Sequence, residues 1–279
     1  MTKISSTFHR LRSSGHMAFM PFITAGDPDL PTMCRLIREL AERGVDLIEI
    51  GFPYSDPIAD GPVIQASYTR ALGHKLHVDD IFAAIKSLTR PIENRKSEIA
   101  NPLPSLVAMV SYALIFRRGA AEFAASARDA GFAGLIVPDL PADEATDLVA
   151  IARHHGLDLI QLIAPTTTAD RTRRILDSAT GFLYCISVAG TTGERVQLPD
   201  ALKSQLRLLK QQTTLPLAVG FGVSRPEQVA ELRGLADGVI VGSAIVRQVA
   251  AISERNQPVD EVIKSVGDFC TSMLAETRR

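Results

Sequence analysis

An acidic residue interrupts an apolar run that is predicted to be a buried strand. Glu49 stands within Asp46–Pro53, with an isoleucine on either side. An ionised carboxylate in such surroundings is costly unless it is paired or has a function. Glu49 could lie on the outer face of the strand and bond to a helix, or it could be a general acid/base with a raised pKa. Its position near the carboxyl end of the strand favours the acid/base.

Two aspartates follow Glu49 on a short loop. The segment Tyr54–Pro62 contains Asp56-Pro and Asp60-Gly, which are both ordinary turn dipeptides. Turn formation could explain either aspartate alone, but two acids beside a strand-end glutamate form a candidate catalytic group. We expect Asp56 to organise the turn and Asp60 to face a substrate.

Glycines mark two junctions between a strand and a helix later in the chain. Gly220–Pro226 and the pair Gly242 and Ser243 each join the end of an apolar run to the expected start of a helix. Glycine lets the backbone approach a ligand closely, and helix N-termini present free N–H groups with a partial positive charge. A formal net charge of −1 attracts no anion over a long range. These junctions therefore predict a local phosphate site.

Several other chemistries find no support in the sequence. The histidines show no metal-ligand spacing, and the 3 cysteines are far apart, so neither a metal site nor a disulfide is expected. Walker, GxSxG and GxGxxG motifs are missing. The charge argues against a nucleic-acid partner, no apolar run approaches the length of a membrane span, and the polar N-terminus lacks the apolar stretch of a secretory signal. We expect a cytoplasmic protein.

Eight short apolar runs must position these residues. Most are continuous rather than alternating, as in parallel strands that are buried on both faces. Strand–helix alternation repeated eight times without a linker predicts an α/β fold, a (β/α)8 TIM barrel that forms a single domain over residues 1–279. The runs are Met17–Thr24, Leu47–Phe52, Leu106–Tyr112, Gly134–Pro138, Asp158–Ala164, Phe182–Ser187, Leu217–Phe221 and Gly238–Gly242.

The stretches between the runs predict amphipathic helices and two long loops. The helices are expected at Leu30–Arg43, near Tyr68–Leu72, and at Val78–Leu88, Ala120–Ala130, Ala142–His155 and Ser224–Gly234. The loops are Arg90–Pro104 and Val188–Asp200, and long loops in compact domains are usually lids or binding loops. Within the second loop, Gly190–Arg195 could be a disordered connection or a lid that meets the carboxylates, and the sequence leaves this open.

The segment Glu49–Gln65 closely resembles the signature of the tryptophan synthase α chain family. The resemblance extends over nearly the whole chain, with further motifs in the order and spacing of the family. These motifs are Pro21–Pro28, Gly134–Pro141, Ala189–Gly193, Gly220–Gly222 and Val241–Ile245.

The resemblance implies a reaction and a set of partners. Members of this family cleave indole-3-glycerol phosphate to indole and glyceraldehyde 3-phosphate on a TIM barrel without a cofactor. The indole then passes to a β subunit that carries pyridoxal phosphate, within an expected α2β2 heterotetramer. By resemblance, Glu49 is the acid/base and Asp60 binds the indole N–H. An acid/base of adjustable charge suits this chemistry, because indole C3 must be protonated before the carbon–carbon bond breaks.

The resemblance also assigns binding residues. The apolar pocket is expected to comprise Phe22, Met109, Ile136, Ile163, Tyr184 and Phe221. Backbone amides at Gly193, Gly222, Gly242 and Ser243 are expected to hold the phosphate. Thr192 is expected to contact Asp60 when its loop closes.

Departures from the family pattern leave alternatives open. Ala113 stands where the family usually has Asn, in a segment that lies toward the β subunit, and Val188 replaces a usual Arg. The chain could therefore be a free-standing indole-3-glycerol phosphate lyase with the same residues. It could also be a non-catalytic barrel that binds phosphate and regulates a partner, which intact Glu49 and Asp60 argue against. Another phosphate-binding aldolase or isomerase would leave the loop after Glu49 unexplained.

Overall fold

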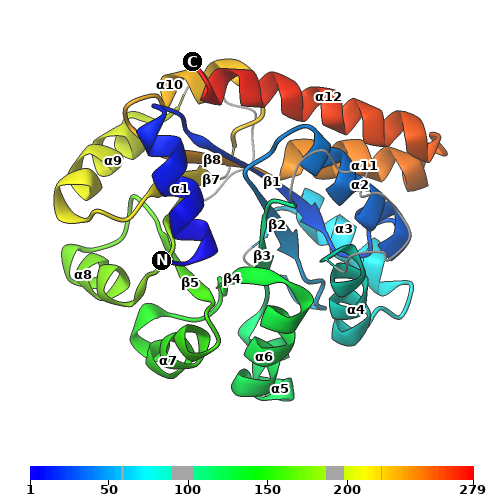
Figure 1. The fold of residues 1–279 in the computed structure, drawn as a ribbon, viewed down its shortest axis with the longest axis horizontal. Helices are drawn as coiled ribbons and strands as arrows, with labels where there is room; N and C mark the ends of the chain where they lie inside the picture. Colours follow the sequence, from blue (N-terminus) through cyan, green and yellow to red (C-terminus); the bar gives the residue numbers. More distant parts are fainter. Residues whose placement is uncertain (58–59, 90–102, 187–197, 221) are drawn as a thin grey trace.

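Eight parallel strands close into a barrel in chain order, and β1 pairs with β8 to complete it (Figure 1). The computed structural model describes residues 1–57, 60–89, 103–186, 198–220 and 222–279. The strands are β1 Ala18–Thr24, β2 Leu47–Gly51, β3 Ser105–Met109, β4 Phe132–Ile136, β5 Asp158–Ile163, β6 Leu183–Ile186, β7 Leu217–Gly220 and β8 Gly238–Val241. The predicted α/β class and (β/α)8 barrel are confirmed.

Helices surround the barrel and connect successive strands (Figure 1). They are α1 Lys3–Ser13, α2 Leu30–Glu42, α3 Pro62–Leu72, α4 Val78–Thr89, α5 Tyr112–Arg118, α6 Ala120–Ala130, the 3-10 helix Ala142–Glu144, α7 Thr146–His154, α8 Ala169–Ser178, α9 Asp200–Gln212, α10 Pro226–Glu231, α11 Ser243–Arg255 and α12 Val259–Thr277. Among the helices so described, none has the length and apolar character needed to cross a membrane.

Several helices differ from the sequence-based expectation. The predicted helix Ala142–His155 forms the 3-10 helix and α7, and the predicted helix Ser224–Gly234 is the shorter α10. α3 starts at Pro62, well before the expected Tyr68, because proline is favoured in the first turn of a helix. The run Leu106–Tyr112 is not one strand: Ser111 caps α5, accepting a hydrogen bond from the Ala113 N–H at 3.3 Å. The polar N-terminus, for which no helix was predicted, forms helix α1, capped by Thr2.

Strand side chains alternate between two apolar layers. In β2, Leu47 belongs to the cluster inside the barrel, whereas Ile48 and Ile50 belong to the layer between strands and helices. Phe19 and Met20 of β1 alternate in the same way. Because both faces of each strand are covered, the strands read as continuous apolar runs.

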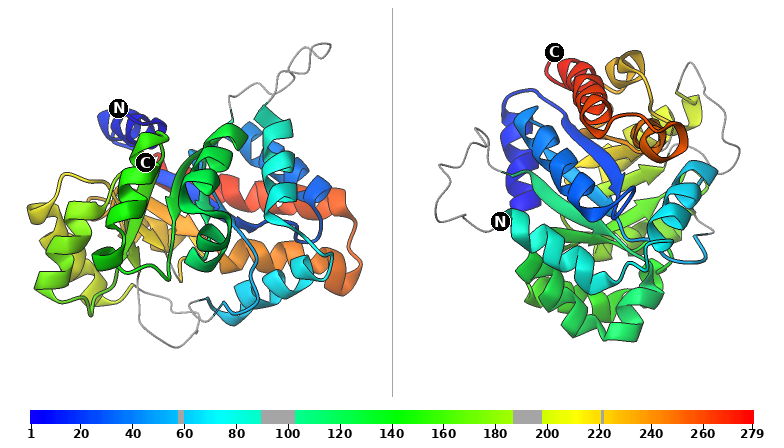
Figure 2. Two further views of the ribbon diagram at one scale, coloured as in Figure 1. Left: turned by 90° about the horizontal axis from the view of Figure 1, so that it is seen from below. Right: turned by 90° about the vertical axis from the view of Figure 1, so that its right-hand side faces the viewer.

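Helix α1 covers the amino end of the barrel. Its Ile4, Phe8 and Leu11 belong to the same cluster as the inward side chains of the strands, and the Phe8 and Phe182 rings lie 5.5 Å apart. Figure 2 shows α1 and the N-terminus on the opposite side of the barrel from α3. A ligand can therefore reach the interior from the carboxyl end of the strands, where α3 lies.

A buried ion pair joins the end of the chain to the first two strands. Asp46 accepts hydrogen bonds from the Phe19 N–H at 2.9 Å and from Arg278 Nη2 at 2.8 Å to each oxygen. Arg278 Nη1 also donates to the Met17 carbonyl at 2.9 Å. Burial raises the pKa of Asp46, and the Arg278 guanidinium counteracts this rise. The pair thus holds the residue after α12 against the entrances of β1 and β2.

Replacing Arg278 with Ala is expected to destabilise the barrel. The change removes the two hydrogen bonds from Arg278 to the buried Asp46 carboxylate and leaves it with the more distant Arg10 Nη2 at 3.8 Å, so the free energy of unfolding should fall by about 1–3 kcal/mol. Urea denaturation followed by circular dichroism measures this change. Arg279→Ala is the matched control, because the Arg279 side chain is 68% exposed. Equal stability of the two variants would contradict a structural role for the pair.

Candidate active site

Glu49 lies in the middle of β2 with its side chain completely buried. It is in register with Phe22 of β1 and Val107 of β3, and its exposed fraction is 0%. Both carboxyl oxygens lack a hydrogen-bond partner among the described residues. The alternative in which Glu49 bonds to an outer helix therefore receives no support. A buried polar group without a partner costs free energy that a ligand could recover.

The surroundings of Glu49 favour its protonated form. Burial raises the pKa of Glu49 to about 8, and the negative charge of Asp60 adds to the rise. At neutral pH the side chain is mostly a neutral acid that can donate a proton. A pKa near neutrality suits a group that must both donate and accept a proton in one cycle.

Asp60 is buried on the loop that follows β2. Its exposed fraction is 8%, and its Oδ2 has no partner among the described residues. Gln65 of α3 fixes the loop, since its Nε2 donates to the Pro57 and Asp60 carbonyls at 3.1 and 2.8 Å. In contrast, Asp56 is exposed and accepts a hydrogen bond from Ser55 Oγ at 2.7 Å. The two aspartates thus differ in burial in the sense expected from the sequence.

Asp60 is held in a mostly ionised state at neutral pH. Burial raises its pKa to about 6, a hydrogen bond with Tyr54 opposes the rise, and the charge of Asp139 adds to it. The Tyr54 hydroxyl in turn has its pKa raised to about 12 by burial and by Asp60, so it remains a donor. Neighbouring carboxyls with pKa values on opposite sides of neutrality are typical of acid/base sites.

Two polar contacts fix α3 against the end of β1. Thr24 Oγ1 and Ser67 Oγ lie 2.6 Å apart. Arg70 donates to both oxygens of the buried Asp27 at 2.9 and 2.8 Å.

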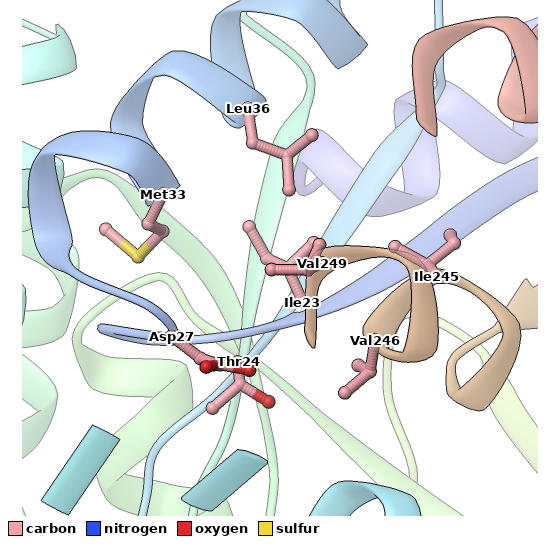
Figure 3. Close-up of a pocket in the computed structure, with 8 residues that line it drawn as sticks. All are labelled: Ile23, Thr24, Asp27, Met33, Leu36, Ile245, Val246 and Val249. Atoms are coloured by element: carbon pink, nitrogen blue, oxygen red, sulfur yellow. The ribbon is translucent and has the colours of Figure 1, made fainter. Parts of the chain in front are cut away.

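Figure 3 shows Thr24 and Asp27 at the edge of a cavity of about 10 Å³, with side chains of α2 and α11 around it. That volume holds about one water molecule, so this cavity is packing space and not a substrate site.

Four of the expected pocket residues are brought together inside the barrel. Phe22, Met109, Ile136 and Tyr184 share the interior cluster that surrounds Glu49. Tyr184 lies over the end of β7, where a Cβ added to Gly220 would come within 2.3 Å of its hydroxyl. Glycine at this position therefore makes room for the ring.

Ile163 does not join this group. It packs in the layer between strands and helices, whereas Leu162 is associated with the interior cluster. Adjacent side chains of a strand point to opposite faces, so only one of the two can face the interior. The assignment of Ile163 to the pocket is wrong for this reason, and Leu162 is its neighbour on the correct face.

The described residues that are expected to bind phosphate lie between the end of a strand and the start of the next helix. Gly242 is the N-cap of α11 and Ser243 is its first residue. Gly222 has a φ of +85°, in the left-handed region that favours glycine. A Cβ added to Gly242 would lie 3.6 Å from Phe22, so this helix start adjoins the interior cluster. The Ile245 and Val246 N–H groups donate to the Gly242 carbonyl at 2.9 and 3.1 Å, so the N–H groups that precede them at the start of α11 are the ones that can bind an anion.

Three expected site residues, Thr192, Gly193 and Phe221, lie outside the described residues, as do the segment Gly190–Arg195 and most of both long loops. Within the described part of the chain, no group of three His, Cys, Asp or Glu side chains could hold a metal ion.

Sequence reasoning missed Tyr54, Tyr68 and Asp139 as neighbours of the acids. The Tyr54 and Tyr68 rings pack in a tilted arrangement with centroids 5.7 Å apart, and both lie close to Asp60. The proximity of Tyr54 to Asp60 in the chain was a usable signal. Tyr68 lay within an expected helix, where an aromatic residue indicates packing more often than a ligand contact.

Comparison with known proteins agrees with this geometry. The family model described as tryptophan synthase alpha chain matches residues 8–273. The chain belongs to the tryptophan synthase α chain family. It is 47% identical over 278 residues to the tryptophan synthase alpha chain of Rhodopirellula baltica, covering 98% of each chain.

Solved structures of the family share the whole fold. The alpha subunit of tryptophan synthase from Legionella pneumophila superposes with a TM-score of 0.86 at 33% identity, covering 99% of this chain and 98% of that one. Tryptophan synthase from M. tuberculosis gives a TM-score of 0.84 at 30% identity, with 100% of both chains covered. The coverage indicates that the barrel, its α1 cover and α12 all belong to the shared architecture.

Replacing Glu49 with Gln is expected to stabilise the protein in a pH-dependent way. Because the pKa of Glu49 is raised to about 8 in the folded state, the wild type loses stability as the pH rises from the ordinary glutamate value toward 8, where folding opposes ionisation. The variant escapes this loss, so its free energy of unfolding should exceed that of wild type by about 1–4 kcal/mol at pH 8 and by little at pH 4.5.

Urea denaturation over this pH range measures the difference. Glu144→Gln is the control, since Glu144 is exposed on the 3-10 helix. A pH-independent difference between Glu49→Gln and wild type would show that Glu49 is ionised in the fold.

Proposed function

We propose that this chain is a cytoplasmic enzyme that cleaves indole-3-glycerol phosphate to indole and glyceraldehyde 3-phosphate, as the α subunit of a tryptophan synthase. The observation that carries the proposal is the pair of buried acids on β2 and on the loop that follows it. Glu49 is buried and mostly protonated, Asp60 is mostly ionised, and both have oxygens without a partner among the described residues. The reaction requires a proton donor and a carboxylate, and this pair supplies both.

The first step is protonation of the indole ring. Glu49 donates its proton to ring carbon C3, which places a positive charge on the ring nitrogen. The Asp60 carboxylate accepts a hydrogen bond from the ring N–H and stabilises that charge. An anion already oriented toward a developing cation is the electrostatic arrangement that lowers a barrier most effectively.

The second step breaks the carbon–carbon bond. The Glu49 carboxylate removes the proton of the hydroxyl on the carbon attached to C3, and that carbon becomes the aldehyde of glyceraldehyde 3-phosphate. The bonding electrons return to C3 and restore the neutral indole ring. Glu49 ends the cycle protonated, as it began. Glu49 supplies the proton transfer in both steps, and Asp60 stabilises the charge between them. Pyridoxal phosphate is expected in the β subunit that receives the indole.

The pocket around the acids suits an aromatic ring with a phosphate tail. Phe22, Met109, Ile136 and Tyr184 supply an apolar surround for the indole ring. Gly222 and the first turn of α11, with Gly242 and Ser243, would hold the phosphate through backbone N–H groups. We include Gly193 and Phe221 in these two groups, and Thr192 as a contact of Asp60, on the family resemblance.

Glu49→Gln should abolish most of the cleavage while preserving substrate affinity. Loss of a general acid/base lowers kcat by about 10²–10⁴-fold, whereas KM should change by less than about threefold. Asp60→Asn should lower kcat by about 100-fold through loss of charge. Indole release by the purified chain, with and without a tryptophan synthase β subunit, measures both effects.

The wild-type chain in the same assay separates the alternatives. Slow release that rises strongly with β supports an α subunit, and rapid release that is independent of β supports a free-standing lyase. No release under either condition would support a regulatory barrel and contradict the proposal. Near-normal turnover by Glu49→Gln would remove Glu49 from the mechanism.

Helix α5 offers an apolar contact for the proposed β partner. Phe116 is 74% exposed, although it is a large aromatic residue. The Tyr112 N–H and the Ser111 hydroxyl donate to Asp139 at 2.8 and 2.7 Å, which fixes the start of the helix. Asp139 also raises the pKa of Asp60. A partner bound at α5 would therefore be linked, through Asp139, to the ionisation of Asp60.

Phe116→Asp should lose stimulation by β while retaining the slow cleavage of the isolated chain. A charge placed at the centre of an apolar contact costs about 2–4 kcal/mol of binding, so half-maximal stimulation should need at least about 30-fold more β. Leu208→Asp is the matched control, because Leu208 of α9 is a large apolar residue that is 54% exposed. Equal stimulation of both variants would exclude α5 from the interface.

A further inference from the structure

Tyr68 carries a buried polar group that the proposed proton transfers do not use. Its side chain points from α3 into the interior cluster and is 1% exposed. Its hydroxyl has no hydrogen-bond partner among the described residues. Such a group costs about 1–3 kcal/mol in a folded protein. Phenylalanine would avoid this cost with the same ring. We therefore expect the hydroxyl to bind a partner that the described residues do not supply.

The Tyr68 hydroxyl lies closer to the mouth of the barrel than Glu49 does. A Cβ added to Gly51 would lie 2.7 Å from the Tyr68 hydroxyl oxygen and 2.5 Å from the Phe22 ring. Gly51 follows Glu49 by two residues on β2, so both face the interior, about 6–7 Å apart along the strand. The Tyr68 hydroxyl therefore stands over the acid, on the side toward the mouth.

The ring of Tyr68 is held in this position from several sides. Its neighbour Ser67 is bonded to Thr24, and Arg70, two residues later, is bonded to Asp27. The Tyr54 ring packs against it in a tilted arrangement, with the ring centroids 5.7 Å apart. A group fixed in this way loses little conformational freedom when it binds a ligand, which is what a positioning residue requires.

The hydroxyl also remains a donor. Burial raises the pKa of Tyr68 well above its ordinary value, and the negative charge of Asp60 acts in the same direction. A neutral phenol can both donate and accept one hydrogen bond. An alcohol partner can use both of these capacities, because an alcohol also donates and accepts.

We propose that the Tyr68 hydroxyl binds the middle hydroxyl of the glycerol phosphate chain, and that Tyr68 is thereby a positioning and specificity residue. This inference rests on the proposed function. In that reaction Glu49 engages the hydroxyl next to the indole ring, and the start of α11 holds the phosphate at the mouth. The middle hydroxyl lies between these two points along the substrate, at the level that Tyr68 occupies above Glu49.

The pairing can be tested by removing each partner separately. Tyr68→Phe and wild type are assayed with indole-3-glycerol phosphate and with the analogue that lacks the middle hydroxyl but keeps the reacting one. With the natural substrate, Tyr68→Phe should lower kcat/KM by about tenfold. With the deoxy analogue, wild type should show a similar loss, and Tyr68→Phe should add less than about twofold. Tyr112→Phe, assayed without β, is the matched control for loss of a phenolic hydroxyl.

A stability measurement separates positioning from a structural role. Since the hydroxyl has no partner among the described residues, Tyr68→Phe should unfold at an equal or higher temperature than wild type in the absence of substrate. A lower melting temperature would make the hydroxyl structural and overturn the inference.

The kinetic outcomes test the role of Tyr68 separately from the proposed function. If wild type cleaves indole-3-glycerol phosphate and Tyr68→Phe cleaves it equally well, the role of Tyr68 is overturned while the proposed function stands. Equal losses with both substrates would also overturn it, because Tyr68 would then act on Glu49 and not on the middle hydroxyl. If wild type does not cleave the substrate, the proposed function fails, and this inference fails with it.

Discussion

Burial of the Glu49 carboxyl in the barrel interior, with neither oxygen bonded among the described residues, disfavours its charged form. That penalty brings its pKa to about 8. A carboxyl in water would be fully ionised at neutral pH and could not donate a proton. The interior tolerates the acid because Glu49 can be neutral there. The chemistry we propose therefore depends on the desolvation that closure of the barrel imposes.

Other parts of the structure maintain this condition. Helix α1 covers the amino end with Phe8 and Leu11, which belong to the interior cluster. The Asp46–Arg278 pair joins the residue after α12 to the start of β2. On the mouth side, contacts of Gln65 and Arg70 fix the loop and helix that carry Asp60 and Tyr68. These contacts lie outside the site, yet they set the positions of its groups.

The sequence by itself determined much about this protein. Continuous apolar runs occur in strands buried on both faces, so eight of them were sufficient to predict a closed parallel barrel. An acid between Ile48 and Ile50 is costly without a function, which singled out Glu49. The segment from Glu49 to Gln65 was specific enough to indicate the family that the comparisons then showed.

Tertiary structure decided what local pattern leaves open. Ile163 and Leu162 are equivalent in an apolar run, and strand register alone decided which one is associated with the interior cluster. The three apolar residues of α1 all meet the barrel core, which stabilises a helix that its composition did not indicate. Tyr68 and Glu49 are far apart in sequence, and they come together because α3 folds back over the end of β2. Such contacts depend on chain path, which residue spacing does not encode.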